Sequence, residues 1–573
     1  MRLPLSLAIA LLFAASPASA AVTAASYFGS AGKDSLTGVA IASDGAILIS
    51  GNSDASSLGG PAARMLGTGG GFVAKLDRAG TKLVWFSWLE AAGQLGLTPR
   101  DEPIVVTGDH LTKLALDGSS VIWKTATLGS TVKSFAVAGS GAVAVLAGSH
   151  AVALAADGQT VLIDVPNVGR SNPSAVALEP SSGDLFVSGD HNAGYGTCGG
   201  PWRSPFIFRY DQSANRIWTL YDYAGQAACD VDLAADSFFS HLFFQPDGTL
   251  YTTGGADGGN TVLTRSAHDL AKNNPALAGA CFASPCYGWK GAAAPRYVGR
   301  LKSDFSDFER SSFIVAHFNR APPGCSCDVP QDDGSTARAN SAGLDYVFPT
   351  STGDVVGAGA AGWHFPTVNA WFPQAAYTPG YPAVLAVLDH DLKTMKMATL
   401  LPGTGSTQAA AYRGGRIVVV GNAPDNSHWT PPAGQETLAQ ATISAAPAGG
   451  ALQADFGGGT QDGFIYVGCV TNESECSAVP PPVSGGGGGA VSGAGASSLG
   501  GAGQLTVGGQ SSGGGAANAT EGAATPDATK PATSGCSCAA VPRPQTNYAW
   551  VAEAPLFLLV CGRKRLRRRS RAR

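Results

Sequence analysis

Short apolar runs alternate with Gly, Asp and Asn turns from residue 26 onward, and no stretch keeps a helical period over about 15 residues. Two kinds of segment recur. The first, as in 38–51, is a strand, a turn and a second strand closed by glycine. The second, as in 72–85, begins with an apolar strand and turns at Asp or Gly before another strand. The pattern predicts β-hairpins throughout.

Related hairpins follow along the chain. Those of the first kind lie at 134–148, 174–189, 241–255, 345–357 and 409–421, with a truncated one at 103–108. Those of the second kind lie at 111–123, 151–163, 206–218 and 384–398, with a weak one around Val262 or Phe313 and an unfinished one at 464–470. Pairing the two kinds gives seven units of four antiparallel strands, which is the pattern of β-propeller blades. The fold class expected is therefore all-β, a seven-bladed β-propeller.

The two ends of the repeat predict how the ring closes. Residues 26–29 match the last strand of a hairpin of the second kind, whereas 464–470 match a first strand that has no partner. We expect the amino-terminal strand to complete the last blade, because this pairing removes two exposed strand edges. The Asp-Gly pairs at 44–45, 117–118, 157–158 and 247–248 supply the positive φ that tight hairpin turns require.

Three stretches resemble a known family. Residues 27–35 (Tyr-Phe-Gly-Ser-Ala-Gly-Lys-Asp-Ser), 72–76 (Phe-Val-Ala-Lys-Leu) and 365–373 are similar to the bacterial seven-bladed β-propeller repeat called SBBP. The match is good in the first and sixth units, and in the others only the period and the turn chemistry remain. The resemblance implies a secreted or surface propeller and brings no catalytic residues with it.

The amino terminus has the features of a secretory signal. Arg2 precedes a short apolar run, which ends in Ala18-Ser19-Ala20, so cleavage is expected after Ala20. Export permits disulfides, and eight cysteines lie in the body of the chain. Proximity favours Cys198 with Cys229, Cys281 with Cys286, and Cys469 with Cys476, while Cys325 and Cys327 are too close together for an unstrained bridge and could each pair elsewhere.

The composition changes after Cys476. Residues 477–520 contain no charged and no aromatic residue, so no core can form there. The expected organisation is a signal peptide (1–20), a propeller (21–477), a disordered Gly-rich stalk (478–535) and a sorting or anchor tag (536–573). The tag resembles the MYXO-CTERM sorting signal of myxobacterial surface proteins, with its apolar run interrupted by Glu553 and Pro555. The residues that carry this resemblance are Gly535, Cys536, Cys538, Arg563, Arg567, Arg568 and Arg569.

The charge distribution and the sequence motifs argue against several classes of function. The 573 residues carry 37 Lys and Arg against 41 Asp and Glu, a net charge of −4, and eight of the positive residues lie within 563–573. The acidic body is thus not expected to bind nucleic acid. The Gly357–Gly362 run fits a dinucleotide motif but is not followed by a helix, and no histidine or cysteine spacing fits a metal, so no cofactor and no metal are expected.

Long insertions at 190–205, 257–312 and 358–382 hold the candidate binding residues. These are aromatic side chains that could stack on sugar rings or anchor a protein, or instead cover blade edges: Trp202, Trp289, Trp363, Trp371, Tyr377 and Tyr381. We expect a monomeric binding or structural module of the cell envelope, at the cell surface or outer membrane or secreted after tag processing. Its partners would be a glycan or protein at the loop face and the sorting machinery, with membrane contact only through the tag. The alternative is an extracellular hydrolase or lyase that acts on a polysaccharide with acidic residues over the central channel.

Overall fold

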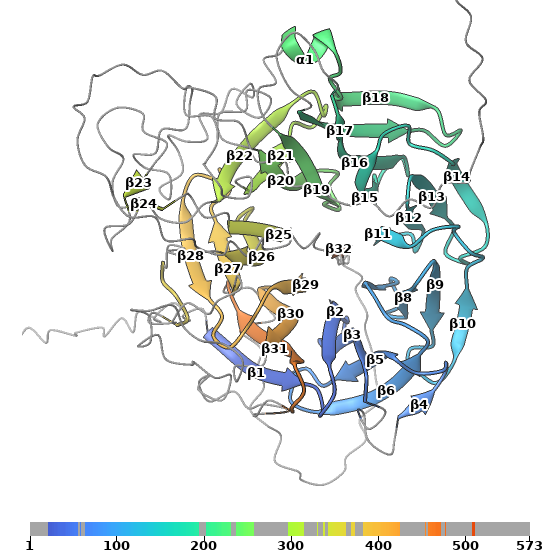
Figure 1. The fold of residues 1–573 in the computed structure, drawn as a ribbon, viewed down its shortest axis with the longest axis vertical. Coiled ribbons are helices and arrows are strands. Elements are labelled where there is room, and N and C mark those ends of the chain that lie inside the picture. Colours follow the sequence, from blue (N-terminus) through green and yellow to red (C-terminus); the bar gives the residue numbers. More distant parts are fainter. Residues whose placement is uncertain are drawn as a thin grey trace, which may run out of the picture. The chain divides into compact units, whose positions relative to one another are not determined.

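Seven sheets arranged in a ring form the body of the protein in a computed structural model (Figure 1). The structure describes residues 21–55, 58, 63–193, 202–230, 236–256, 296–314, 329–330, 336–337, 342–361, 368–372, 382–424, 453, 457–471, 476 and 507–509. Each blade contains four antiparallel strands that follow one another in the chain, except that the last blade takes its outer strand from the amino terminus. The predicted fold class is confirmed.

The blades are numbered in chain order, with the inner strand first. Blade 1 is β2 (Asp34–Ile41), β3 (Ile47–Ser53), β5 (Gly71–Leu76) and β6 (Leu83–Leu89); blade 2 is β7 (Leu95–Leu97), β8 (Pro103–Thr107), β9 (His110–Leu114) and β10 (Val121–Lys124); blade 3 is β11 (Val132–Val137), β12 (Val143–Ala147), β13 (His150–Leu154) and β14 (Val161–Val165). Blade 4 is β15 (Asn172–Leu178), β16 (Leu185–Asn192), β17 (Arg203–Tyr210) and β18 (Arg216–Tyr221); blade 5 is β19 (Ser237–Phe244), β20 (Leu250–Ala256), β21 (Arg296–Leu301) and β22 (Phe308–Ile314). Blade 6 is β25 (Ala342–Pro349), β26 (Val355–Ala361), β27 (Ala383–Leu388) and β28 (Met395–Leu400); blade 7 is β29 (Thr407–Arg413), β30 (Arg416–Pro424), β31 (Gln461–Cys469) and β1 (Ala21–Phe28).

Five short elements of the described residues lie outside this scheme, and the last of them is described further below. The strand β4 (Arg64–Met65) runs parallel to β6 at the outer edge of blade 1. The strands β23 (Val329–Pro330) and β24 (Thr336–Ala337) pair with each other between blades 5 and 6 in the chain. The helix α1 (Gln226–Asp230) follows blade 4.

The ring closes as the sequence predicts. Strand β1 pairs antiparallel with β31, with Tyr27 opposite Phe464, so the first strand of the described chain is the outer strand of the last blade (Figure 1). Phe28 and Phe72, from blades 7 and 1, have ring centroids 5.5 Å apart. The closure therefore buries aromatic surface between the first and last blades as well as pairing two strand edges.

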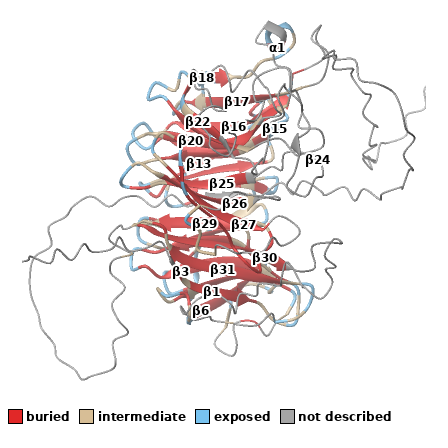
Figure 2. Cartoon of the chain, turned by 90° about the vertical axis from the view of Figure 1, so that its left-hand side faces the viewer, coloured by how far each residue is buried: buried red, intermediate tan, exposed pale blue. Residues whose placement is uncertain are grey.

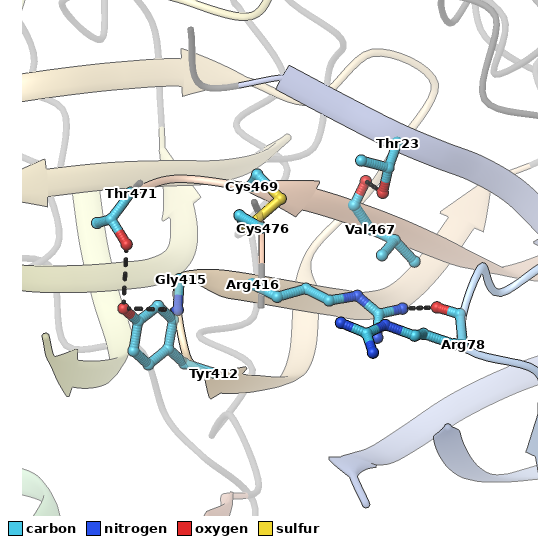
Figure 3. Close-up of a disulfide and its surroundings, with 9 residues drawn as sticks. All are labelled: Thr23, Arg78, Tyr412, Gly415, Arg416, Val467, Cys469, Thr471 and Cys476. Atoms are coloured by element: carbon cyan, nitrogen blue, oxygen red, sulfur yellow. Dashed lines mark hydrogen bonds between the residues drawn. A yellow bond between two sulfur atoms is a disulfide. The ribbon is translucent and has the colours of Figure 1, made fainter. Parts of the chain in front are cut away.

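The other side of this junction holds a buried arginine and a disulfide (Figure 3). Arg416, at the start of β30 and 5% exposed, donates hydrogen bonds to the Gly45 carbonyl oxygen (2.6 Å) and to the carbonyl of Arg78, both in turns of blade 1. Cys469, the last residue of β31, forms a disulfide with Cys476. Of the three pairs favoured by proximity, this is the one that lies within the described residues.

The sequence prediction of blade 5 is wrong in part. The range 257–312 was assigned to an insertion, but it contains β21 and most of β22. The apolar pattern of β21 is broken by Arg296 and Arg300, and the buried Arg300 is paired with Glu309 at 2.9 Å. The other two insertions are shorter than expected, because β16 extends to Asn192 and β26 extends to Ala361.

A strand also lies within the predicted stalk. Strand β32 (Val507–Gly509) adds a fifth strand to the inner edge of blade 3, with Val507 opposite Ala136 on β11. It also contacts the inner strands β2, β7 and β29, and Figure 1 shows it in the centre of the ring. A Gly-rich segment without aromatic residues predicts no packed core, but pairing through the main chain does not require one. The rest of 478–535 lies outside the described residues.

The core lies between neighbouring blades, where the inner three strands of each blade are mostly buried (Figure 2). Between blades 4 and 5, for example, the ring of Phe186 meets that of Phe244 edge to face, with centroids 4.9 Å apart. Each sheet thus buries both faces against its neighbours, which explains the nearly continuous apolar runs in the sequence.

Glycine occurs in the second strand of many blades, at the point where the main chains of the inner and second strands come very close together. In five blades, a Cβ placed on one glycine of the second strand would lie 1.7–2.2 Å from a carbonyl oxygen of the inner strand or of the residue just before it. Real Cβ atoms essentially never come within 3.0 Å of such an atom, so only glycine fits. The five glycines are Gly51, Gly189, Gly254, Gly359 and Gly421.

Candidate binding face

The two faces of the ring differ in the length of their connections. On one face, which we call the turn face, every connection within a blade has six residues or fewer. The predicted Asp-Gly turns lie here, and their glycines have positive φ, for example 81° at Gly45. On the opposite face, the connection face, the second and third strands of blades 1, 4, 5, 6 and 7 are joined through 54–70, 193–202, 257–295, 362–382 and 425–460. All the long insertions therefore leave from one face.

A polar position repeats around the inner strands at the connection face. In six blades, the pairing of the inner strand with the second strand is shifted by a β-bulge. The residue at each bulge is polar and half-buried, which places six polar side chains in equivalent positions around the ring. They are Thr37, Lys133, Ser174, Ser240, Asp345 and Gln408.

Hydrogen bonds connect these bulges from one blade to the next. In the first four interfaces, the side chain of one blade donates to a main-chain carbonyl oxygen at the corresponding place in the following blade. The pairs are Thr37 and Gly93 (3.1 Å), Gln94 and Lys133 (2.8 Å), Lys133 and Pro173 (3.4 Å), and Ser174 and Phe239 (2.8 Å). Thr253 and Tyr346 donate in the same way to the carbonyls of Asp345 and Gln408. The bulges therefore fix neighbouring blades to one another around the channel.

A charged and aromatic cluster lies over blades 4 and 5. Arg203, the first residue of β17, donates through Nε to Asp190 Oδ1 at 2.7 Å and places its guanidinium 4.7 Å from the ring centroid of Phe238. The guanidinium of Arg296, the first residue of β21, lies 4.9 Å from the centroid of the same ring. Burial raises the pKa of Asp190, and the hydrogen bonds and charge of Arg203 oppose this rise. The arrangement presents a half-buried aromatic ring with two arginines beside it on the connection face.

A second ion pair fixes the loop that follows blade 4. Asp222 accepts hydrogen bonds from Nε and Nη2 of Arg170 at 2.5 and 2.6 Å, and His191 Nε2 lies 3.0 Å from its Oδ1. Burial favours the neutral acid, but the hydrogen bonds and charges of His191 and Arg170 outweigh it and lower the pKa of Asp222. Asp222 has a positive φ of 70°, so the pair also holds an unusual main-chain conformation.

Two of the six predicted aromatic residues lie within the described residues. Trp202, just before β17, packs against Ala193 and Ala228, and Trp371 packs against the core between blades 6 and 7. Both rings are half-buried, so each covers part of a blade and leaves part of its surface exposed. Trp289, Trp363, Tyr377 and Tyr381 lie outside the described residues, as do Ala20, Cys198, Cys281, Cys286, Cys325, Cys327 and every residue of the predicted tag; of Cys229 only the main chain is described.

Two further surfaces lie on the outside of the ring. A groove of about 660 Å³ runs between blades 3 and 4, with Asn167, Arg170, Tyr210, Asn215 and Arg216 in its walls. On the outer strands of blades 1–4, large apolar side chains are exposed near the turn face: Leu83, Val84, Val121, Ile122, Val161, Leu162 and Ile217.

Sequence reasoning missed the charged cluster and the bulge ring. The cluster joins residues from four strands, from Asp190 on β16 to Arg296 on β21, so no local motif marks it. The bulge ring did leave a signal, because a polar residue interrupts the apolar pattern near the start of the inner strand in six blades. The Gly357–Gly362 run proves to be strand β26 as far as Ala361.

These features define a seven-bladed β-propeller with one elaborated face. No protein-family model matches the chain, and no curated protein sequence matches it. Two solved structures are similar over most of their own length. One is a protein of unknown function from Bacteroides caccae, with 10% identity, a TM-score of 0.32, and coverage of 65% of this chain and 94% of its own. The other is the WD40 β-propeller domain of Doa1, with 9% identity, a TM-score of 0.38, and coverage of 72% of this chain and 99% of its own.

Proposed function

We propose that this propeller is an exported binding or structural module of the cell envelope and that its ligand contacts the connection face. One observation carries the proposal: every long connection within a blade leaves from that face, while the opposite face has only tight turns. Long loops held by a rigid scaffold are the usual position of binding residues. The signal-like start, the SBBP-like repeats and the MYXO-CTERM-like end support export and display at the surface, or secretion after the tag is processed.

The ligand proposed for this face is a glycan or a protein. Phe238, with Arg203 and Arg296 beside it, provides a ring face and guanidinium donors, which suit the apolar face and the hydroxyl groups of a sugar. The half-buried rings of Trp202 and Trp371 add aromatic surface on the same face. This combination is also typical of protein interfaces, where aromatic residues and arginine dominate the binding energy.

The alternative is a polysaccharide hydrolase or lyase. It requires carboxyl groups free to transfer protons or to attack substrate. Over blades 4 and 5, at the proposed ligand site, the carboxylates of Asp190 and Asp222 are each held by an arginine, at 2.7 and 2.5 Å. Among the described residues, no three His, Cys, Asp or Glu side chains lie close enough together to hold a metal ion, and no helix is long and apolar enough to cross a membrane. At this site, the ion pairing favours the binding module.

A glycan array with the full mature chain tests the proposal. The Arg296→Ala variant removes one guanidinium beside Phe238, and Arg216→Ala is its matched control, because Arg216 makes the same kind of contact with Phe208 (4.5 Å) next to a turn on the other face. We expect the signal of a bound glycan to fall about tenfold in Arg296→Ala and to stay unchanged in Arg216→Ala. If glycan binding were lost only in Arg216→Ala, the glycan site would lie in the groove between blades 3 and 4, which Arg216 lines. No bound glycan, together with turnover of a polymeric substrate, would replace the proposal with the enzyme.

A further inference from the structure

Two acidic side chains are completely buried where the ring closes. Asp34 is the first residue of β2, and Asp462 is the second residue of β31, so they come from the first and last blades. Both are 0% exposed. Their carboxylates approach each other at Gly29, where an added Cβ would lie 2.1 Å from Asp462 Oδ1 and 3.0 Å from Asp34 Oδ2.

Each carboxylate has one satisfied and one unsatisfied oxygen. Asp34 Oδ2 accepts hydrogen bonds from the Ser30 amide (2.6 Å) and hydroxyl (3.0 Å). Asp462 Oδ2 accepts hydrogen bonds from the Gly457 amide (2.5 Å) and from Gln453 Nε2 (3.3 Å). Oδ1 of both residues is buried and has no hydrogen-bond partner among the described residues. An unsatisfied buried carboxylate oxygen is costly, and here there are two.

No positive side chain compensates for the pair. Among the described residues, no Lys, Arg or His forms an ion pair with either carboxylate; the ion pairs of the ring lie elsewhere. Burial, together with the nearby charge of Asp34, raises the pKa of Asp462 to about 6. Two like charges held close together in a protein interior need either a shared proton or a bound cation.

Main-chain carbonyl oxygens lie in the loops next to the two carboxylates. The loop from Gly457 to Gly459 packs against the segment before Asp34, so closely that an added Cβ would lie 2.9 Å from the Ser30 carbonyl oxygen at Gly457 and 2.1 Å from the Gly32 carbonyl oxygen at Gly459. Carboxylates combined with main-chain carbonyls in irregular loops are the ligands that calcium prefers, whereas zinc and copper favour nitrogen or sulfur.

We propose that Asp34 and Asp462 bind a calcium ion at the junction of the first and last blades. The two unsatisfied Oδ1 atoms are its first ligands, and carbonyl oxygens of the surrounding loops are available as further ones. One divalent ion neutralises both carboxylates. It also ties the segment that joins β1 to β2 to the last strand of the ring, so its binding stabilises the closed propeller. This site is separate from the ligand site proposed above, and either can exist without the other.

The experiment counts bound calcium directly. Equilibrium dialysis of the full mature chain, freed of metal by a chelator, is carried out at neutral pH with calcium at about 1 mM, because extracellular calcium modules bind in the 10⁻⁴ to 10⁻³ M range. We expect Asp462→Asn to bind one ion fewer per chain than the wild type. Thermal unfolding should show a rise of about 1–3 °C on adding calcium to the wild type and no rise in the variant.

Two controls make the result decisive. Asp44→Asn removes an exposed carboxylate, paired with Lys75, on the turn face, and it should bind as much calcium as the wild type. If Asp462→Asn does not fold, Asp34→Asn must lose the same single ion. Equal calcium binding by wild type and both site variants would overturn the proposal. The proposal would also be overturned if calcium did not change the stability of the wild type and Asp462→Asn were more stable than the wild type. That result would identify two carboxyl groups that share a proton.

Discussion

The close approach of glycine to the inner strand gives the sharpest test of the packing argument. In Gly421→Ala, the new Cβ would lie 2.2 Å from the Ser406 carbonyl oxygen and 2.8 Å from a ring carbon of Phe464. The ring can rotate, but the carbonyl belongs to the main chain just before a bulge and would have to move by roughly 0.8 Å. The substitution therefore strains blade 7 at the place where the ring closes.

The expected magnitude follows from two terms. Overpacking against a main chain costs about 1–3 kcal/mol. Moving the bulge at Gln408 also weakens the hydrogen bond from the Tyr346 hydroxyl to its carbonyl, which contributes about 1 kcal/mol. The free energy of unfolding should fall by about 2–4 kcal/mol, which lowers the melting temperature by about 2–4 °C for a propeller of this size.

Differential scanning calorimetry of the mature protein measures the shift. Gly139→Ala is the matched control, because Gly139 lies in an exposed turn and nothing lies within 4 Å of its added Cβ. The control should change the stability by less than about 0.5 kcal/mol. If the two variants melt within about 1 °C of each other, which is less than the expected shift, the steric account of these glycines is refuted.

Three other predictions concern separate parts of the ring. Deleting 21–28 removes β1 and exposes the edge of β31, so the melting temperature should drop by many degrees; an unchanged melt would contradict the closure. The pKa of Asp222 is lowered from 3.8, so its ion pair with Arg170 stabilises the fold above about pH 4 and is lost as the carboxyl is protonated. In urea unfolding, Asp222→Asn should be less stable than the wild type at pH 7, and this difference in stability should shrink below about pH 4. Cysteines at Ala136 and Val507, which lie opposite each other on β11 and β32, should form a disulfide detectable by peptide mass spectrometry, whereas free thiols at both positions would argue against β32 in the channel.

The fold could be predicted because each blade repeats the same local chemistry. The hairpins identified from the sequence begin at Gly38, Ser134, His241 and Ala409, one residue after the bulges at Thr37, Lys133, Ser240 and Gln408. The polar bulge residue interrupts the apolar pattern, so a reading based on hydrophobicity starts the strand too late. The hydrophobic pattern also failed to predict β21, because Arg296 and Arg300 are charged although both belong to this strand.

The sites could not be predicted, because they depend on ring geometry. Arg203, Phe238 and Arg296 meet only when blades 4 and 5 are adjacent, and Asp34 meets Asp462 only when the ring is closed. No local spacing connects such residues. Trp202 and Trp371 could be identified as loop aromatics, but whether their rings face a ligand or cover a blade depends on neighbours that the sequence does not reveal.

The position of β1 also determines when the molecule can fold. Ala21–Phe28 is synthesised before any other strand, and its partner Gln461–Cys469 comes after the rest of the blades. At about 5–20 residues per second, a ribosome needs about 20–90 s to make the chain between them. Six blades can form during this interval, but the seventh must wait with an unpaired strand at each end. The ring can therefore be completed only after β31 has been made. Until then, the exposed edges of β1 and of the unfinished seventh blade must not pair with other strands.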